Sequence, residues 1–165
     1  MATKTLIVLR HAKSSWRTTQ ADIHRPLSER GEKDAVAAGR ILSAYDLDVV
    51  LCSSATRAQQ TWQQATTGGA TCADVRVTEA IYHAWPGELL GEIQELSESQ
   101  PSALLIGHQP TLSDLVLSLA KPSHLTRSVA EHFPTSALSV LTYRGAWRTL
   151  AHGKATLKRY EVPRD

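Results

Sequence analysis

Cysteine is scarce in this chain of 165 residues, which holds only Cys52 and Cys72. The two form neither a CxxC pair nor a spacing typical of zinc ligands, so the sequence excludes a zinc motif built on cysteines. It also excludes a scaffold held by several disulfides. One disulfide between the two is the alternative, but two free thiols are the expectation for a cytoplasmic protein.

Long apolar runs are also missing. The apolar run at residues 6–9 is far shorter than the roughly 20 residues of a membrane span, and it lacks the form of a signal peptide. The net charge of +2 is small, and no long basic run is present, which argues against nucleic acid as a partner. We therefore expect a cytoplasmic protein without a membrane or nucleic-acid partner, folded as one domain over residues 1–165 and monomeric.

Strand-like and helix-like segments alternate along the chain. Apolar runs rich in β-branched residues predict buried strands at residues 5–9, 48–52 and 103–107, with a short strand at 75–77. Helical patterns follow Ser28, Ser54, Pro86 and Pro110, of which the serines suit an N-cap and the prolines an early helix position. Residues 121–135 show no regular pattern.

The end of the chain has a different pattern. Residues 136–143, "SALSVLTY", alternate with period two, and Gly145 suits a turn into a last strand; this predicts an antiparallel meander at a sheet edge. Repeated strand–helix alternation before it predicts parallel strands joined by helices. The expected fold is α/β, a three-layer α/β/α sandwich with a mainly parallel central sheet.

Cationic side chains follow three of the predicted strands. Arg10 and His11 end the first, Arg57 lies in the first turn after the second, and His108 ends the "ALLIG" strand. Ligands of open α/β sheets bind beyond the carboxyl ends of the strands. If these strands are neighbours, the four side chains surround one small volume.

An anion is the natural occupant of such a cluster. Like charges repel and partly buried cations need compensation, and a tetrahedral phosphoryl group offers enough oxygens for two guanidiniums and an imidazole. A helix N-terminus near Ser54 would add support, and histidine is a competent nucleophile toward phosphorus. Taken singly, each residue has an ordinary interpretation as a loop, helix-surface or turn residue, so the argument depends on their coincidence.

Four segments resemble a known family. They are "LRHAKSSW", "RPLSERG" (residues 25–31), "SSATRAQQT" (residues 53–61) and "IGHQP" (residues 106–110). In this order they resemble the histidine phosphatase superfamily, also called the phosphoglycerate mutase-like group. The short length, Lys13 after "RHA", and "FPTSAL" (residues 133–138) look most like its SixA branch, the phosphohistidine phosphatases.

The resemblance implies a role for each matching residue. His11 would attack phosphorus and carry the phosphoryl group, while Arg10, Arg57 and His108 would hold the nonbridging oxygens. Neither a metal nor another cofactor would be needed. Lys13 and Ser14, the next residues along, are further candidates for substrate binding. The family more often has glycine where this chain has Ala12.

The resemblance is weaker at the residue expected to act as the general acid. Glu79, in "VTEAIYHA", stands where many members have a glutamate, with a surface carboxylate as the alternative interpretation and Asp22 as a second candidate. A leaving imidazole on a labile P–N bond needs less protonation than an alkoxide. A weak or absent acid would therefore fit phosphoramidate chemistry better than sugar-phosphate chemistry.

The gaps between the motifs leave little chain for a lid, which predicts a shallow, open site. Such a site admits a phosphorylated side chain on a protein, so the leading hypothesis is a SixA-type phosphatase acting on a phosphorylated protein or a small phosphorylated substrate. One alternative is a small-molecule phosphomonoesterase, with a deeper pocket and a working Glu79. Another is a noncatalytic phosphate- or phosphopeptide-binding module. Trp16 is expected to pack on the body of the protein, and the tryptophans in general to lie in the core.

Overall fold

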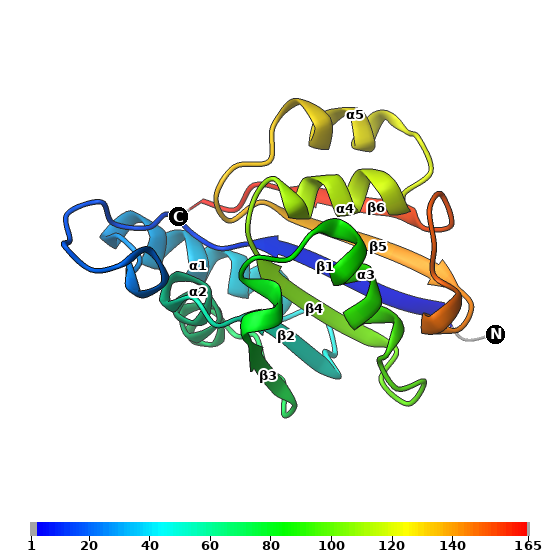
Figure 1. Ribbon diagram of the computed structural model, residues 1–165, viewed down its shortest axis with the longest axis horizontal. Helices are drawn as coiled ribbons and strands as arrows, with labels where there is room; N and C mark the ends of the chain where they lie inside the picture. Colours follow the sequence, from blue (N-terminus) through cyan, green and yellow to red (C-terminus); the bar gives the residue numbers. More distant parts are fainter. Residues whose placement is uncertain (1–2, 165) are drawn as a thin grey trace.

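Six strands form one mixed sheet in the computed structural model, which describes residues 3–164 (Figure 1). Their order is β3-β2-β4-β1-β5-β6. The pairs β2–β3, β2–β4 and β1–β4 are parallel, whereas β5 and β6 are antiparallel additions beside β1. The strands are β1 Thr3–Arg10, β2 Val49–Ser53, β3 Val75–Thr78, β4 Ser102–Gly107, β5 Leu138–Arg144 and β6 Thr156–Glu161. The mainly parallel core of the sheet and its antiparallel edge are both confirmed.

Helices cover both faces of this sheet. They are α1 Glu29–Leu42, α2 Thr56–Thr67, α3 Pro86–Gln94, α4 Thr111–Leu119 and α5 His124–Glu131, with short 3-10 turns η1 Asp22–His24, η2 Glu79–Ile81 and η3 Trp147–Thr149. One buried cluster joins the sheet to α1 and α2, and another joins it to α3, α4 and α5. The predicted three-layer arrangement is therefore confirmed.

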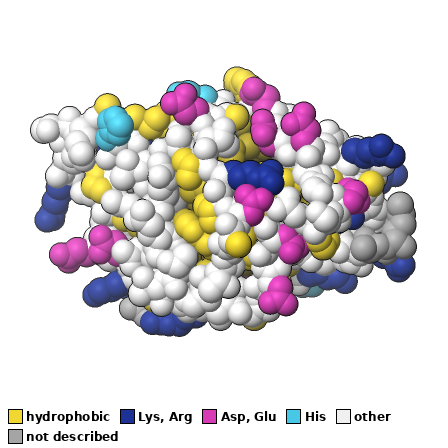
Figure 2. Space-filling view, turned by 90° about the horizontal axis from the view of Figure 1, so that it is seen from below, with side chains coloured by type: hydrophobic (Ala, Val, Ile, Leu, Met, Phe, Trp, Pro, Cys, Tyr) yellow, Lys and Arg dark blue, Asp and Glu magenta, His cyan; other side chains and the backbone are white. Residues whose placement is uncertain are grey.

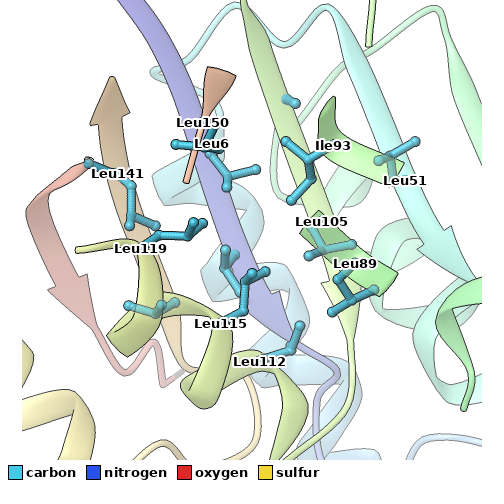
Figure 3. Packing of buried hydrophobic residues seen from close by; sticks show 14 of the residues in the cluster. Leu6, Leu51, Leu89, Ile93, Leu105, Leu112, Leu115, Leu119, Leu141 and Leu150 are labelled. Atoms are coloured by element: carbon cyan, nitrogen blue, oxygen red, sulfur yellow. The ribbon is translucent and has the colours of Figure 1, made fainter. Parts of the chain in front are cut away.

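The first strand shows why the central segments are continuously apolar. Leu6 and Val8 belong to the cluster under α3 and α4, which Figure 3 shows from close by, whereas Ile7 and Leu9 belong to the cluster under α1 and α2. Successive side chains of a strand point to opposite faces. Because both faces are covered, every residue in the run is buried, as expected for a parallel sheet.

The segment expected to be irregular contains a helix. α5 lies within residues 121–135 and begins after Ser123, whose hydroxyl accepts a hydrogen bond from the Thr126 N–H at 3.3 Å. Thr126 Oγ1 accepts one in return from the Ser123 N–H at 2.8 Å. This is a capping box with threonine where glutamate or glutamine is usual. The prediction was wrong because the helix is short and its start signal unusual.

The start of α2 also differs from expectation. The N-cap is Ala55, which offers no capping side chain, and Ser54 does not cap the helix. Instead the hydroxyl of Ser53, the last residue of β2, accepts a hydrogen bond from the Ala55 N–H at 3.2 Å. The residue that supports the turn into α2 is therefore the buried Ser53, one position before the predicted cap.

The tryptophans differ from a third expectation. Trp147 is fully buried and Trp62 partly so, but Trp16 and Trp85 expose 78% and 75% of their surface. Trp16 is anchored on one face by the Arg25 guanidinium, 3.7 Å from its ring centroid, but most of its surface is exposed. The expectation that the tryptophans as a group lie in the core is wrong.

The surface charge pattern and the character of the helices both concern possible binding partners. The face that carries the β3 edge is shown in Figure 2, where hydrophobic atoms form a central band and cationic and acidic side chains are interspersed around it. No helix within residues 3–164 combines the length and the apolar character needed to cross a bilayer.

Candidate active site

Three adjacent strands deliver the predicted site residues to one edge of the sheet. β2, β4 and β1 are neighbours. Arg10 ends β1, Arg57 lies in the first turn of α2 after β2, and His108 follows β4. Together with His11 they line one cavity of about 550 Å³, to which Lys13 and Ser14 also contribute. The structure thus brings together all the predicted site residues except Glu79.

His11 is fixed at the floor of this cavity. Its side chain is buried, and its Nδ1 lies 2.7 Å from the carbonyl oxygen of Ala12. A carbonyl only accepts, so in the neutral ring Nδ1 carries the proton and Nε2 carries the lone pair. The backbone is held as well, since the His11 N–H donates to Gly107 O at 3.1 Å and His11 O accepts from the Ser136 N–H at 3.0 Å.

The surroundings of His11 keep its ring neutral. Burial is the main reason that its pKa falls to about 3; the hydrogen bond to Ala12 opposes the fall, and nearby His108, Arg57 and Arg10 add to it. A neutral imidazole is the nucleophilic form. No separate base is therefore needed to prepare Nε2 at neutral pH.

His108 stands beside His11, with 5.2 Å between the ring centroids. Its Nε2 lies 2.8 Å from the hydroxyl oxygen of Ser53. That oxygen accepts from the Ala55 N–H and still has its own proton to donate to His108 Nε2; in the tautomer that takes this proton, the His108 ring proton lies on Nδ1. Burial, followed by the charge of Arg57, lowers the pKa of His108 to about 4.

Unpaired polar atoms gather at this site. Within residues 3–164, five buried side-chain nitrogen or oxygen atoms have no hydrogen-bond partner, and three of them are Arg10 Nε, Arg57 Nε and His108 Nδ1. Buried donors without acceptors are uncommon in proteins. A phosphoryl group supplies acceptor oxygens for three such donors. Burial and the charge of Arg57 also lower the pKa of Arg10, so an anion here would relieve repulsion.

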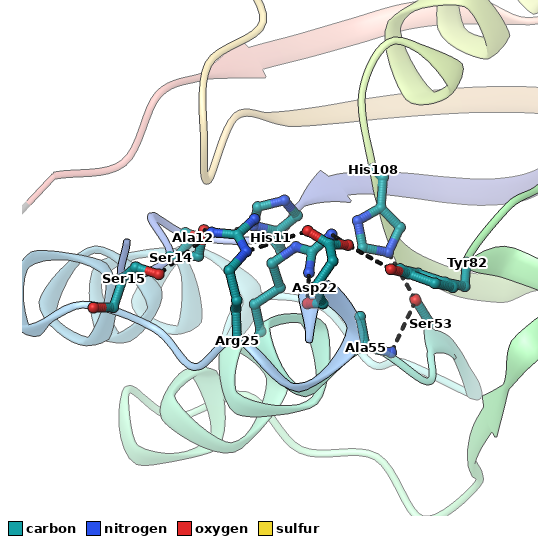
Figure 4. Close-up of polar contacts among 11 residues, drawn as sticks. His11, Ala12, Ser14, Ser15, Asp22, Arg25, Ser53, Ala55, Tyr82 and His108 are labelled. Atoms are coloured by element: carbon teal, nitrogen blue, oxygen red, sulfur yellow. Dashed lines mark hydrogen bonds and ion pairs between the residues drawn. The ribbon is translucent and has the colours of Figure 1, made fainter. Parts of the chain in front are cut away.

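A carboxylate outside the predicted quartet binds Arg57. Arg57 donates from Nη1 to the backbone oxygen of Asp22 at 2.8 Å and from Nη2 to Asp22 Oδ2 at 3.1 Å. The Tyr82 hydroxyl donates to the same Oδ2, and Arg25 Nε donates to Oδ1 at 3.2 Å (Figure 4). These contacts, led by that of Tyr82, lower the pKa of Asp22 to about 2. Asp22, the second candidate for the general acid, is therefore a carboxylate at neutral pH.

Glu79 lies elsewhere. It begins η2 after the edge strand β3, its side chain is exposed, and it is not among the described residues that line the cavity. Its role as a general acid stays a prediction, which this exposed position outside the lining does not support.

The segment "RPLSERG" holds the loop that follows His11. Lys13 O accepts from the Ser28 N–H at 2.9 Å and from the Ser28 hydroxyl at 3.1 Å. The Ser28 hydroxyl in turn accepts from the Gly31 N–H at 3.1 Å as the N-cap of α1. A Cβ on Gly31 would lie 2.0 Å from Lys13 O, so only glycine allows this close packing.

Sequence reasoning missed several supporting residues. Besides Ser53 and Tyr82, Thr61 contributes a buried hydroxyl that accepts from the Ala12 N–H at 2.9 Å and donates to Arg57 O at 2.7 Å. A threonine on the apolar face of a predicted helix, one turn after Arg57, is the signal that could have found it. No group of three or more histidine, cysteine or acidic side chains suited to a metal ion occurs among the described residues.

Comparisons with known proteins agree with this geometry. The model of the histidine phosphatase superfamily (branch 1) matches residues 6–114. The protein Rv1276c of Mycobacterium tuberculosis is 41% identical over 162 residues, covering 94% of this chain and all of that protein. The solved structure of a candidate phosphohistidine phosphatase SixA from Nakamurella multipartitia has a TM-score of 0.86 and 31% identity, covering 99% of this chain and 98% of that one. Another, from Agrobacterium tumefaciens, has a TM-score of 0.80 and 26% identity, covering 97% and 99%. The chain belongs to the histidine phosphatase superfamily, on its SixA-like branch.

Proposed function

We propose that this phosphatase hydrolyses phosphohistidine through a phosphohistidine intermediate on His11. The observation that supports it best is the neutral His11 ring, whose Nδ1 is engaged by Ala12 while Nε2 is left to a cavity lined by Arg10, Arg57 and His108. This constellation combines a nucleophile with preorganised cationic donors, which is what phosphoryl transfer requires.

In the first step, the Nε2 lone pair of His11 forms a bond to phosphorus. The bond from phosphorus to the leaving imidazole nitrogen breaks, and its electron pair goes to that nitrogen. Arg10, Arg57 and the Nδ1–H of His108 hold the nonbridging oxygens as charge shifts onto them. Because His11 Nδ1 keeps its proton, the phosphorylated ring becomes cationic, and the Ala12 carbonyl 2.7 Å away stabilises that charge.

In the second step, water attacks phosphorus and the P–Nε2 bond breaks. The electron pair returns to His11, the water's proton passes to solvent, and inorganic phosphate leaves. The cationic phospho-ring is a good leaving group, because His11 sits among Arg10, Arg57 and His108, which disfavour a positive charge on it. The same surroundings that keep the free ring neutral thus promote breakdown of the intermediate.

The proposed leaving group, an imidazole, does not need a proton from a carboxylic acid of the site. Glu79 is exposed outside the cavity lining and Asp22 is ionised, so neither is placed to donate a proton. An alkoxide would need such a donor, whereas the leaving imidazole takes a proton on its outer nitrogen from water. The arrangement therefore favours a P–N bond over the P–O bond of a sugar phosphate.

The test is a comparison of substrates and variants. Purified protein is assayed for phosphate release from a histidine-phosphorylated protein, from sugar phosphates and from para-nitrophenyl phosphate, with and without a chelator. We expect the phosphohistidine substrate to have the highest kcat/KM and the chelator to have no effect. Faster turnover of a sugar phosphate by orders of magnitude would contradict the assignment.

The intermediate is tested separately. Rapid quenching with radiolabelled substrate should trap acid-labile, base-stable label on His11. His11→Ala should abolish turnover, whereas His24→Ala serves as the matched control, because His24 is exposed in the same segment and does not line the cavity. A binding module without catalysis would release no phosphate even as the wild type.

A further inference from the structure

Two of the four tryptophans are mostly exposed and lie near the candidate active site. Trp16 and Trp85 expose 78% and 75% of their surface, and the remaining large hydrophobic side chains described as exposed are all valines. A tryptophan offers a large apolar surface whose burial stabilises an interface. Two such side chains at one opening indicate a contact surface.

Trp16 is held from beneath. It lines the same cavity as His11 and Arg57, and the guanidinium carbon of Arg25 lies 3.7 Å from its ring centroid. Arg25 is itself buried, with Nη1 donating to the Ser14 hydroxyl at 2.7 Å and Nε bound to Asp22. The cation–π contact therefore fixes one face of the indole, and the exposed remainder is presented to solvent.

Trp85 lies on the other side of His108. As the N-cap of α3, it donates its backbone N–H to Glu88 Oε1 at 3.0 Å. It lines a smaller cavity of about 220 Å³ together with Tyr82 and His83. That cavity and the one around His11 share His108 and Gln109 as lining residues, so the two cavities adjoin and the tryptophans stand on either side of the phosphoryl site.

We infer that Trp16 and Trp85 form a docking platform for the folded protein that carries the phosphohistidine; this rests on the proposed function. A small phosphorylated molecule seated on His11 lies in the cavity that Trp16 lines, whereas Trp85 lines the adjoining one. An occupant that buries both has to cross the opening between them, which a protein surface does. Exposed tryptophans beside arginines are also the composition enriched at the energetically important centres of protein interfaces.

The charges around the platform define the surface that fits it. Beyond the four residues at the phosphoryl site, the cavity is lined by four cations, Lys13, Arg25, Arg30 and Arg164, and Asp34 is the one carboxylate among the described lining residues. Arg17 lines the groove that adjoins Trp16. Arg25 is paired with Asp22, and Arg30 and Arg164 share Asp34, but the cations around the cavity still outnumber these two carboxylates. We therefore expect a partner with acidic side chains around its phosphohistidine, which also speeds encounter.

The experiment compares a protein with a small substrate that bears the same bond. Trp16→Ala, Trp85→Ala and the double variant are assayed on a panel of acidic histidine-phosphorylated phosphotransfer proteins and on free phosphohistidine. For the best protein substrate we expect each single variant to lower kcat/KM about tenfold and the double variant about a hundredfold, mainly through KM. For free phosphohistidine, which is too small to bury both rings, we expect each variant to lose several-fold less activity than on the protein substrate.

Two controls separate docking from damage. Val77→Ala removes another exposed apolar side chain, on β3 and outside both cavities, and should leave both substrates unaffected. Trp16→Phe keeps an aromatic ring over Arg25 and should retain most of the activity on protein.

The possible outcomes also separate this inference from the proposed function. Equal losses on protein and free phosphohistidine would mean that the tryptophans serve the small-molecule site and would overturn the platform. So would unchanged activity of the double variant on protein, or a panel with no member preferred over free phosphohistidine by at least about tenfold. Failure of the proposed function looks different, because the wild type would then hydrolyse no phosphohistidine of either kind.

Discussion

Arg57 and Asp22 form a two-point contact across 35 residues of sequence, from the guanidinium to both the backbone oxygen and the carboxylate of Asp22. The pair places an anion beside a residue expected to bind the phosphoryl group. The carboxylate lowers the net positive charge of the site and holds the guanidinium in one orientation. If Arg57 binds the phosphoryl group as proposed, Asp22 competes with the substrate for Arg57 and also positions its guanidinium.

Replacing Asp22 with asparagine separates these two effects. Asp22→Asn keeps the backbone acceptor and the shape of the side chain but removes the negative charge. We expect inorganic phosphate to inhibit about threefold more strongly, a modest change because half-exposed charges are screened. The measurement is the inhibition constant of phosphate at low and high salt, with a smaller gain at high salt. Weaker inhibition would mean that positioning of Arg57 by the carboxylate outweighs the charge.

The close packing of Gly31 on Lys13 leads to a second prediction. Gly31→Ala would place a methyl group 2.0 Å from Lys13 O, which forces α1 and the loop after His11 apart. We expect a loss of about 1–3 kcal/mol in the free energy of unfolding and a lower kcat. Urea denaturation and steady-state kinetics measure the two effects.

The matched control is another helical glycine. A Cβ on Gly91, within α3, meets no atom within 4 Å, so Gly91→Ala is expected to stabilise the protein by up to about 1 kcal/mol. If both variants behaved alike, the contact between Gly31 and Lys13 would not be what fixes the loop.

The sequence predicted those parts of the fold that depend on local pattern. Buried strands between two helical layers need continuous apolar runs, and residues 5–9 and 103–107 were found for that reason. The short α5, which begins at His124, was not expected because its capping box has Thr126 where an acidic or amide side chain is usual. Local propensity is a weak signal for a helix of one or two turns.

Some residues of the candidate site could likewise be predicted from the sequence, and others could not. Arg10, His11, Arg57 and His108 stand at strand ends, so topology predicts that they meet. Ser53, Thr61 and Tyr82 act through contacts between distant segments, such as the 2.8 Å contact of Ser53 with His108. Nothing in the local pattern indicates these partners. The local pattern did not predict that Trp16 is exposed either, because its indole ring packs on Arg25, nine residues further along the chain.

The low pKa values of His11 and His108 predict a loss of stability in mild acid. Both are lowered from 6.5, to about 3 and about 4, so the unfolded chain binds more protons than the native chain below pH 6.5. The contribution of the two neutral histidines to the free energy of unfolding is therefore fully present above that pH and is lost as the pH drops toward 4. Urea denaturation at about pH 7 and about pH 5 should show this loss.

Variants identify the source of that loss. His108→Gln should reduce the difference in unfolding free energy between the two pH values, whereas His24→Gln, at an exposed position, should leave the difference unchanged. An equal pH dependence in His108→Gln and wild type would show that the buried imidazole is not responsible.

Ser53 gives the last prediction, because its hydroxyl orients His108 without reaching the substrate. It is fully buried, accepts from the Ala55 N–H and lies 2.8 Å from His108 Nε2. Ser53→Ala removes the hydroxyl that can donate to His108 Nε2 and so favour the tautomer protonated on Nδ1, and we expect kcat to fall about tenfold while KM changes little. Nitrogen NMR of the His108 ring should show the wild type protonated on Nδ1 and the variant shifted toward the Nε2–H tautomer. Ser53→Thr restores a hydroxyl and should recover part of kcat. An unchanged tautomer together with a reduced kcat would mean that Ser53 acts through packing of the turn into α2 and not through His108.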